Sequence, residues 1–322
     1  MEYKEYLLKS FDGTLINVIT AGKGEETIVV SNGLGGNFKI FEEIIKDIPN
    51  VRFISWDYRG LYKSHVPENK NDVTIEHHVK DLEFILKNEK IDKAIFLGWS
   101  MGATINLHLY KQKPEYFKGM ILLNPVNKAT IKNMLSLVRF LNNIVRYADK
   151  FNLPYFKNLP DLINDLPGKF TEKYTYKLLE RLQKYHFVYS KFLKAVSKIP
   201  RIATYLKKLK IVHSNMDDYF FEDIFKEYAN LNMELYIEIV KDLFSYDDNE
   251  DIYGKIDLQV LLIYSTRDIF VPYDYIKKII SLNPKIEPLE IFRGSHYGLI
   301  EFPELVSLGI KRYLRRLKEA KV

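Results

Sequence analysis

Short runs of β-branched and other apolar residues alternate with amphipathic stretches through the first 125 residues. Such runs predict buried strands, and apolar positions three and four residues apart predict helices. This alternation is typical of a mostly parallel sheet with helices on both faces. The predicted strands are Leu15–Thr20, Thr27–Ser31, Val51–Trp56, Ala94–Leu97 and Met120–Leu123, and the predicted helices are 41–48, 75–86 and Ser100–Gln112.

The same alternation resumes after about residue 255, whereas residues 127–254 lack it. This middle segment has Leu, Lys, Tyr and Phe at helical spacing and is interrupted by prolines, which predicts a set of helices. We therefore predict an α/β core with a doubly wound, mostly parallel sheet, made of residues 1–126 and 255–322, and a helical cap insertion at 127–254. In the second part of the core, the predicted strands are Val260–Tyr264 and Leu289–Phe292, and the predicted helices are Tyr273–Ile280 and Leu305–Leu317.

Composition indicates an intracellular globular protein. No apolar run approaches the roughly 18 residues of a membrane-spanning helix. The charged start, Met1–Tyr6, has no apolar segment for export, so we expect the mature protein to begin near residue 1. Cysteine is absent, which excludes disulfides and thiol catalysis and fits a reducing compartment. We expect a cytoplasmic location. The net charge of +6 on 322 residues does not favour a nucleic-acid partner.

The segment Gly98-Trp99-Ser100-Met101-Gly102 matches the pattern Gly-x-Ser-x-Gly. It lies between a predicted strand and a predicted helix, the context in which a sharp turn exposes a serine hydroxyl. Glycines on either side let neighbouring backbone pass close to such a turn. The helix N-terminus also favours negative charge beside Ser100. Ser100 is therefore the candidate nucleophile.

A serine nucleophile needs a base, and His296 is the candidate among seven histidines. It lies in the small-residue loop Arg293–Gly298, between a predicted strand and a predicted helix. The orienting acid is expected in the loop after the preceding strand, where Asp268 stands. The rival acid position, after the strand that ends at Leu123, holds Asn124 rather than a carboxylate.

With these motifs the chain resembles the α/β-hydrolase superfamily over residues 1–125 and 255–322, and the insertion corresponds to the variable cap. Asn32–Gly36 looks like the family's His-Gly loop, Asp57–Gly60 like its Asp-x-Arg-Gly turn, and Asp268–Pro272 like its acid loop. The resemblance implies that the backbone N–H groups of Leu34 and Met101 form the oxyanion hole. Asn32 stands where the family usually has histidine.

The same glycine loop also mimics a dinucleotide-binding fingerprint. Gly33 and Gly35 follow a strand, and Asp57 comes about 20 residues later. Phe38 stands where the third glycine is required for close helix packing, which disfavours a bound NAD. Metal chemistry is disfavoured as well, because His77 and His78 point to different sides of a helix and no His-Glu-x-x-His run exists. We predict that the protein requires no cofactor.

Charge within the insertion is divided into two blocks. Asn127–Lys210 contains 18 Lys and Arg against 5 Asp and Glu, a net charge of +13, whereas Ile211–Gly254 contains 2 against 12, a net charge of −10. Two interpretations stay open: the blocks neutralise each other, or the basic block meets an anionic partner such as a membrane surface or coenzyme A. Aromatic residues of the insertion are candidates for an acyl pocket: Tyr155, Phe156, Phe187, Tyr189, Phe192, Tyr219, Phe220 and Phe221.

Together these features predict a serine hydrolase that cleaves a carboxylic ester or thioester with an apolar acyl group. Two alternatives are an acyltransferase on the same fold and a non-catalytic α/β-hydrolase-like binding protein. In the family that this chain resembles, epoxide hydrolases and haloalkane dehalogenases use an aspartate at this turn. The serine at position 100 therefore disfavours both activities. The substrate, the acyl chain length and the oligomeric state do not follow from the sequence.

Overall fold

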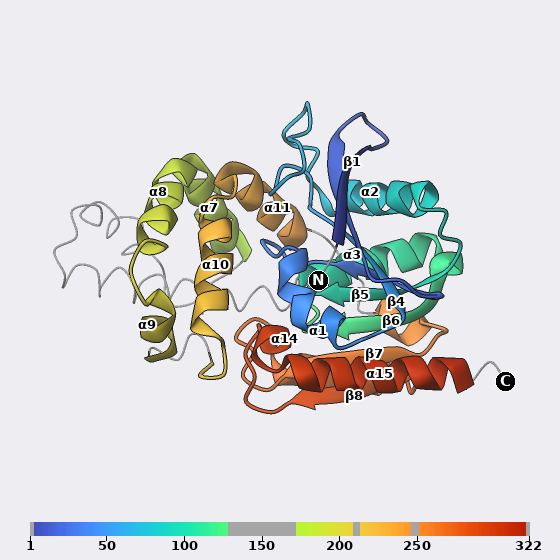
Figure 1. Ribbon diagram of the computed structural model, residues 1–322. Helices are drawn as coiled ribbons and strands as arrows, with labels where there is room; N and C mark the ends of the chain where they lie inside the picture. The colour runs from blue at the N-terminus through green and yellow to red at the C-terminus, as the bar shows by residue number, and fades with distance from the viewer. Residues whose placement is uncertain (1–2, 128–171, 209–212, 246–250, 320–322) are drawn as a thin grey trace.

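Eight strands form one sheet in the order β1-β2-β4-β3-β5-β6-β7-β8 in the computed structural model (Figure 1), which describes residues 3–127, 172–208, 213–245 and 251–319. The neighbours from β4 to β8 pair in parallel, whereas β2 is antiparallel to both β1 and β4. The strands are β1 (Tyr3–Lys9), β2 (Leu15–Ala21), β3 (Glu26–Ser31), β4 (Val51–Trp56), β5 (Ala94–Trp99), β6 (Phe117–Leu123), β7 (Val260–Ser265) and β8 (Ile286–Ile291).

Helices cover both faces of this sheet, because successive residues of the central strands point to opposite sides. In β3, Val29 joins the core on one face, while Ile28 and Val30 join the core on the other. The first face is covered by α2 (Ile75–Asn88), α3 (Met101–Gln112) and α13 (Tyr273–Leu282). The second face is covered by the short α1 (Glu42–Lys46), α14 (Gly298–Glu301) and the long α15 (Pro303–Glu319).

The predicted doubly wound α/β core is confirmed, with three local differences. Strand β1 was not predicted, because it lies at the sheet edge and its residues are exposed or half-buried on both faces, which removes the apolar alternation. Strand β8 begins three residues before the predicted Leu289 and ends at Ile291, and the side chain of Phe292 is 66% exposed. Where one helix over residues 41–48 was predicted, the structure has the 3₁₀ turn Phe38–Phe41 followed by the short helix α1.

Between β6 and β7 the described chain is helical, as the cap prediction requires. Residues 128–171, 209–212 and 246–250 of the predicted cap lie outside the described residues. The helices of this insertion are α7 (Glu172–Lys184), α8 (His186–Val196), α9 (Ile202–Lys208), α10 (Asp218–Ala229), α11 (Met233–Ser245) and α12 (Asp251–Lys255).

Helices α10 and α11 contact the loops that leave the carboxyl ends of β3 and β4. A Cβ on Gly35 would lie 2.6 Å from the ring of Tyr228, and one on Gly60 would lie 2.3 Å from the side chain of Leu235. Both glycines have positive φ, +77° and +75°, so a substitution would strain the backbone as well. The insertion therefore packs against the edge of the sheet where parallel-strand proteins place their functional loops.

Candidate active site

Ser100 lies at a sharp turn between β5 and α3. Its backbone has φ 53° and ψ −118°, and it occupies the position just before the first residue of α3. A Cβ on Gly98 would lie 2.6 Å from the backbone of Ala103, and one on Gly102 would lie 2.0 Å from the carbonyl oxygen of Ser31. Both flanking glycines are thus required for the strand and helix to approach each other. A strained non-glycine residue at such a turn is a mark of a functional site.

His296 comes from the loop between β8 and α14, and its Nε2 lies 2.9 Å from Oγ of Ser100. Its side chain is 9% exposed. The backbone carbonyl of His296 accepts hydrogen bonds from Nε1 of Trp99, at 3.2 Å, and from Nδ2 of Asn124, at 3.1 Å. Residues at the carboxyl ends of two neighbouring strands, β5 and β6, therefore fix the position of this histidine.

Asp268 lies in the loop after β7, with its carboxylate fully buried. Its Oδ2 is 2.7 Å from Nδ1 of His296. Its Oδ1 accepts hydrogen bonds from the backbone N–H groups of Phe270, at 2.7 Å, and Val271, at 3.0 Å. One oxygen thus holds the carboxylate in its loop while the other contacts the imidazole. The structure brings Ser100, His296 and Asp268 into one hydrogen-bonded chain.

Asn124 occupies the rival acid position but does not contact the imidazole ring. Its Oδ1 accepts from the backbone N–H of Ser265 at 2.9 Å, and its Nδ2 donates to the carbonyl of His296. Its φ of 41° is one that asparagine tolerates better than most residues. This position requires a side chain that both donates and accepts a hydrogen bond, and an ionised carboxylate can only accept.

The glycine loop Asn32–Gly36 lies beside the turn that carries Ser100. A Cβ on Gly33 or on Gly36 would lie 2.7 Å from the ring of Trp99. The side chain of Asn32 anchors the loop, because its Nδ2 donates to the carbonyl of Trp56 at 3.1 Å and to Oγ of Ser55 at 3.2 Å. Leu34 is in this loop, and Met101 is the first residue of α3. The two proposed N–H donors therefore belong to adjacent segments.

Two tyrosines of the insertion, Tyr228 and Tyr236, approach the glycine loop at Gly35. Their rings meet edge to face with centroids 5.5 Å apart, and burial raises the pKa of both hydroxyls. Tyr62 donates from its hydroxyl to the carbonyl of Gly35 at 2.5 Å. The sequence did not single out these three residues, because no local pattern shows which cap side chains meet the core.

The aromatic residues predicted to line an acyl pocket differ in their exposure. Tyr219 is 85% exposed and Phe187 is 52% exposed, so these two side chains do not line a buried pocket. Phe192 is buried. Tyr155 and Phe156 lie outside the described residues. Two aromatic rings of the core lie close to the imidazole of His296: the ring centroids of Trp99 and Phe270 are 5.9 Å and 4.9 Å from its centroid.

Glu301 of α14 connects the histidine loop to the insertion. Its carboxylate accepts from the backbone N–H of Ser295 at 2.7 Å and also from the hydroxyl of Ser295. It further accepts from the backbone N–H of His213 at 3.2 Å. Ser295 directly precedes His296, so this buried carboxylate links the insertion to the histidine loop through three hydrogen bonds.

The Asp-x-Arg-Gly turn stabilises the fold through hydrogen bonds of its buried side chains. The buried guanidinium of Arg59 donates to both oxygens of Asp81, at 2.8 and 2.5 Å, and to Asp12 at 2.8 Å. Asp57 accepts from Nδ2 of Asn17 at 2.8 Å and from the N–H of Lys63 at 3.2 Å. Burial raises the pKa of Asp57 to about 6. Asp57 is therefore engaged within its own turn.

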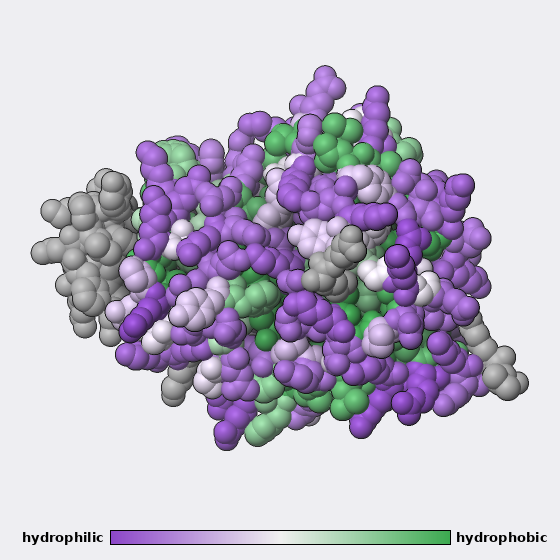
Figure 2. Space-filling model, viewed as in Figure 1, coloured by the Kyte–Doolittle hydropathy of each residue, from purple (hydrophilic) through white to green (hydrophobic). Residues whose placement is uncertain are grey.

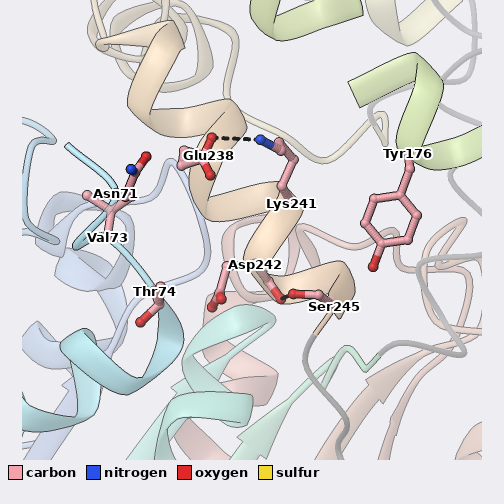
Figure 3. A pocket seen from close by; sticks show the side chains of 8 residues that line it. All are labelled: Asn71, Val73, Thr74, Tyr176, Glu238, Lys241, Asp242 and Ser245. Carbon is pink, nitrogen blue, oxygen red and sulfur yellow. Dashed lines mark hydrogen bonds and ion pairs between the residues drawn. The ribbon is translucent and has the colours of Figure 1, made fainter. Parts of the chain in front are cut away.

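Two cavities lie where the insertion meets the core, and neither is lined by Ser100, Asp268 or His296. The larger, about 830 Å³, extends from β1 to the segment between α10 and α11. The smaller, about 190 Å³, is shown in Figure 3, with Asp242 of α11 facing Thr74. There Oδ2 of Asp242 accepts the N–H of Ile75, at the start of α2, at 2.6 Å. Within the described ranges, no group of histidines and carboxylates is arranged to hold a metal ion.

Residues 26–303 match the sequence profile of the α/β-hydrolase fold family, and the chain belongs to this family. Over 184 residues it is 22% identical to a proline iminopeptidase from Saccharolobus solfataricus, covering 56% of this chain and 53% of that protein. Over 113 residues it is 25% identical to a karrikin insensitive 2 receptor from Petunia hybrida, covering 34% and 41%. The chain thus spans about half or less of the length of these curated relatives.

Among solved structures, a thermophilic esterase from Thermogutta terrifontis superposes with a TM-score of 0.68 at 14% sequence identity, over 98% of this chain and 99% of that one. At this identity the likeness shows the fold. None of the helices described in this chain is long and apolar enough to cross a membrane.

Proposed function

We propose that this protein is a serine hydrolase that cleaves a carboxylic ester or thioester with an apolar acyl group, without a cofactor. The observation that carries the proposal is the chain of hydrogen bonds from Asp268 through His296 to Ser100. Its geometry fits a nucleophile and base within hydrogen-bond reach, with the base oriented by a third group. Residues 127–254 act as the cap. A cytoplasmic location remains a prediction from the sequence.

In this mechanism, Oγ of Ser100 attacks the substrate carbonyl while Nε2 of His296 takes the hydroxyl proton. The N–H groups of Leu34 and Met101 donate to the oxyanion that forms. His296 then returns the proton to the leaving alcohol or thiol, and an acyl group stays on Ser100. Water attacks the acyl-enzyme with His296 as base, which releases the acid and restores the serine. Asp268 keeps the Nδ1 proton of His296 directed toward itself.

A panel of p-nitrophenyl esters and acyl-coenzyme A substrates tests this function. We expect hydrolysis by the native chain and a loss of at least roughly 10³-fold in kcat for Ser100→Ala, since the nucleophile is removed. Ser281→Ala is the matched control, because Ser281 is an exposed serine of α13 whose hydroxyl donates to the carbonyl of Lys278 in the same helix at 2.7 Å. Equal activity of Ser100→Ala and Ser281→Ala would overturn the proposal.

Two other functions are separated by the same assays. An acyltransferase would pass the acyl group from Ser100 to an added alcohol in preference to water, so the ratio of ester product to free acid distinguishes it from a hydrolase. The similarity to the petunia receptor motivates the second alternative, a binding protein. That function would be indicated if a substrate analogue bound the native chain but none of the esters and thioesters of the panel was hydrolysed.

A further inference from the structure

The ion pairs that the acidic helices α10 and α11 form with other described elements are mainly with the core. Asp223 and Glu227 of α10 pair with Lys39, and Glu234 of α11 pairs with Lys70. Across the described residues, a single ion pair joins the basic and acidic blocks of the insertion, between Lys207 and Asp218 at 2.5 Å. Mutual neutralisation of the two blocks is therefore not what the described helices show.

Among the described residues, most lysines and arginines of α7, α8 and α9 form no ion pair with a carboxylate. On α7, Lys177, Arg181 and Lys184 recur at positions i, i+4 and i+7, and all three are exposed. This spacing places them on one side of the helix. None of them pairs with a carboxylate of a described residue, and Glu180 is the one acidic residue between positions 176 and 208.

Helix α8 repeats this arrangement with an aromatic residue in the same row. Phe187, Lys191 and Lys194 recur at i, i+4 and i+7, and Lys198 follows one turn later, just beyond the helix end. The ring of Phe187 is 52% exposed, while Phe192 on the opposite side is buried. The apolar side of α8 packs on α10 and α11, so the row with the lysines faces outward.

Helix α9 adds two exposed residues to this surface. Tyr205, which is 54% exposed, and Lys208 lie three residues apart on the helix, and the exposed Arg201 directly precedes it. The buried residues Ile202 and Leu206 face α10 instead. In Figure 1, α8 and α9 lie on the side of the insertion farthest from the sheet, and Figure 2 shows a mainly hydrophilic surface over α8, α9 and α10.

We propose that the outer rows of α7, α8 and α9, here called the basic face, bind peripherally to an anionic lipid bilayer. The basic face combines eight exposed cations with one carboxylate and two exposed aromatic rings. Lysine and arginine are attracted to anionic headgroups, and aromatic rings enter the interface between headgroups and acyl chains.

A bilayer fits the basic face better than coenzyme A or an acidic protein does. The cations form outward rows on three helices, and none of them lines either of the two cavities described above. A small anionic ligand needs a concave site. Cations spread over outward rows of three helices match the continuous negative charge of an anionic bilayer surface, and the rings of Phe187 and Tyr205 can enter its interface.

Flotation of the full chain with lipid vesicles tests this proposal without reference to catalysis. We expect binding to equimolar phosphatidylcholine and phosphatidylglycerol vesicles and much weaker binding to phosphatidylcholine alone. Each cation near the surface strengthens binding roughly fivefold, so Lys191→Glu, Lys194→Glu and Lys198→Glu together should weaken it roughly a hundredfold or more. Binding should also fall as salt rises from about 0.1 M to about 1 M, since the Debye length drops from about 10 Å to about 3 Å.

The matched control is Lys23→Glu, Lys93→Glu and Lys111→Glu, three exposed lysines of the core that give the same change in net charge. A loss as large as that of the α8 variant would overturn the proposal, as would equal binding of the native chain to neutral and anionic vesicles. The corresponding Lys→Gln variant of α8 should give an intermediate loss, which separates lost attraction from misfolding. Far-ultraviolet circular dichroism should be unchanged in all variants.

Phe187→Ser with Tyr205→Ser separates a bilayer from a soluble polyanion. For a bilayer we expect weaker flotation, by about tenfold or more for two interfacial rings, but unchanged elution from a heparin column, because the cations are kept. If this variant keeps full vesicle binding while the lysine variant loses both vesicles and heparin, the partner is a soluble polyanion and the bilayer proposal is wrong.

Discussion

At the scale of single residues, the two oxygens of Asp268 have separate tasks. Oδ1 is held by the N–H groups of Phe270 and Val271, and Oδ2 contacts Nδ1 of His296. A carboxylate held in this way keeps the imidazole in the tautomer whose Nε2 can accept the proton of Ser100.

Asp268→Asn should lower kcat by on the order of 10⁴ while the fold is retained. The amide oxygen can still accept from Phe270 and Val271, which directs the NH₂ group to Nδ1 and forces the proton of His296 onto Nε2. Steady-state kinetics and thermal melting check this. Asp274→Asn is the matched control, because Asp274 is almost fully exposed on α13. Activity of Asp268→Asn close to that of Asp274→Asn would show that the acid lies elsewhere.

The sequence was informative about residues whose roles depend on local context. A glycine-flanked serine between strand and helix, and two loop residues after late strands, identified Ser100, Asp268 and His296, which the structure brings together. Asn124, Tyr228 and Glu301 were not identified as site neighbours. Their contacts join segments more than 90 residues apart or depend on the path of the insertion, and one sequence carries no pattern for such pairings.

At the scale of elements, α14 connects the histidine loop to the insertion through Glu301. Glu301→Ala would leave three hydrogen-bond donors without their acceptor, on Ser295 and on the backbone of His213. These half-buried donors can in part turn to water, and a fully buried unsatisfied donor costs about 1–3 kcal/mol, so we expect a moderately lower melting temperature.

We also expect a fall in kcat larger than the change in KM for Glu301→Ala, since the displaced residue precedes His296. Glu304→Ala, on the exposed side of α15, should change neither quantity. Glu301→Gln should recover part of the activity, because its amide oxygen accepts from one of the donors. If Glu301→Ala lowers stability but leaves kcat intact, the carboxylate does not position the histidine.

The elements themselves were predictable where burial is one-sided or complete. Strands β3 to β7 are buried runs, and α2 and α15 have one apolar side, so the periodicity is visible in the sequence. Strand β1 has no buried face of its own and depends on pairing with β2. The four-residue α14 is too short for a helical period.

At the scale of the whole molecule, the charge blocks of the insertion were visible in the sequence but their partners were not. Lys39 and Lys70, which pair with the acidic helices, lie more than 150 residues earlier in the chain. Which charges neutralise each other is set by how the cap packs on the core.

The free energy of unfolding of the whole molecule should depend on pH through the carboxyl group of Asp57. Burial raises its pKa from the ordinary value of 3.8 to about 6, so the folded protein holds this proton more tightly than the unfolded chain does. The corresponding stability is present below about pH 4 and is lost as pH rises through about 6, a change of about 3 kcal/mol.

Asp57→Asn removes this loss, because an amide oxygen still accepts from Asn17 and Lys63. The free energy of unfolding of the variant, relative to the native protein, should rise by up to about 3 kcal/mol between about pH 4 and about pH 7. Urea unfolding at a series of pH values checks this. A difference that does not vary with pH would show that the carboxyl of Asp57 titrates normally.

Labelling with a fluorophosphonate probe, read by mass spectrometry of the digested protein, tests most directly whether Ser100 is an activated nucleophile. We expect one labelled serine, Ser100, because a hydroxyl hydrogen-bonded to His296 reacts where ordinary hydroxyls do not. Labelling should vanish in Ser100→Ala and become much slower in His296→Ala. Label on another serine, or undiminished labelling of Ser100→Ala, would contradict the serine hydrolase assignment.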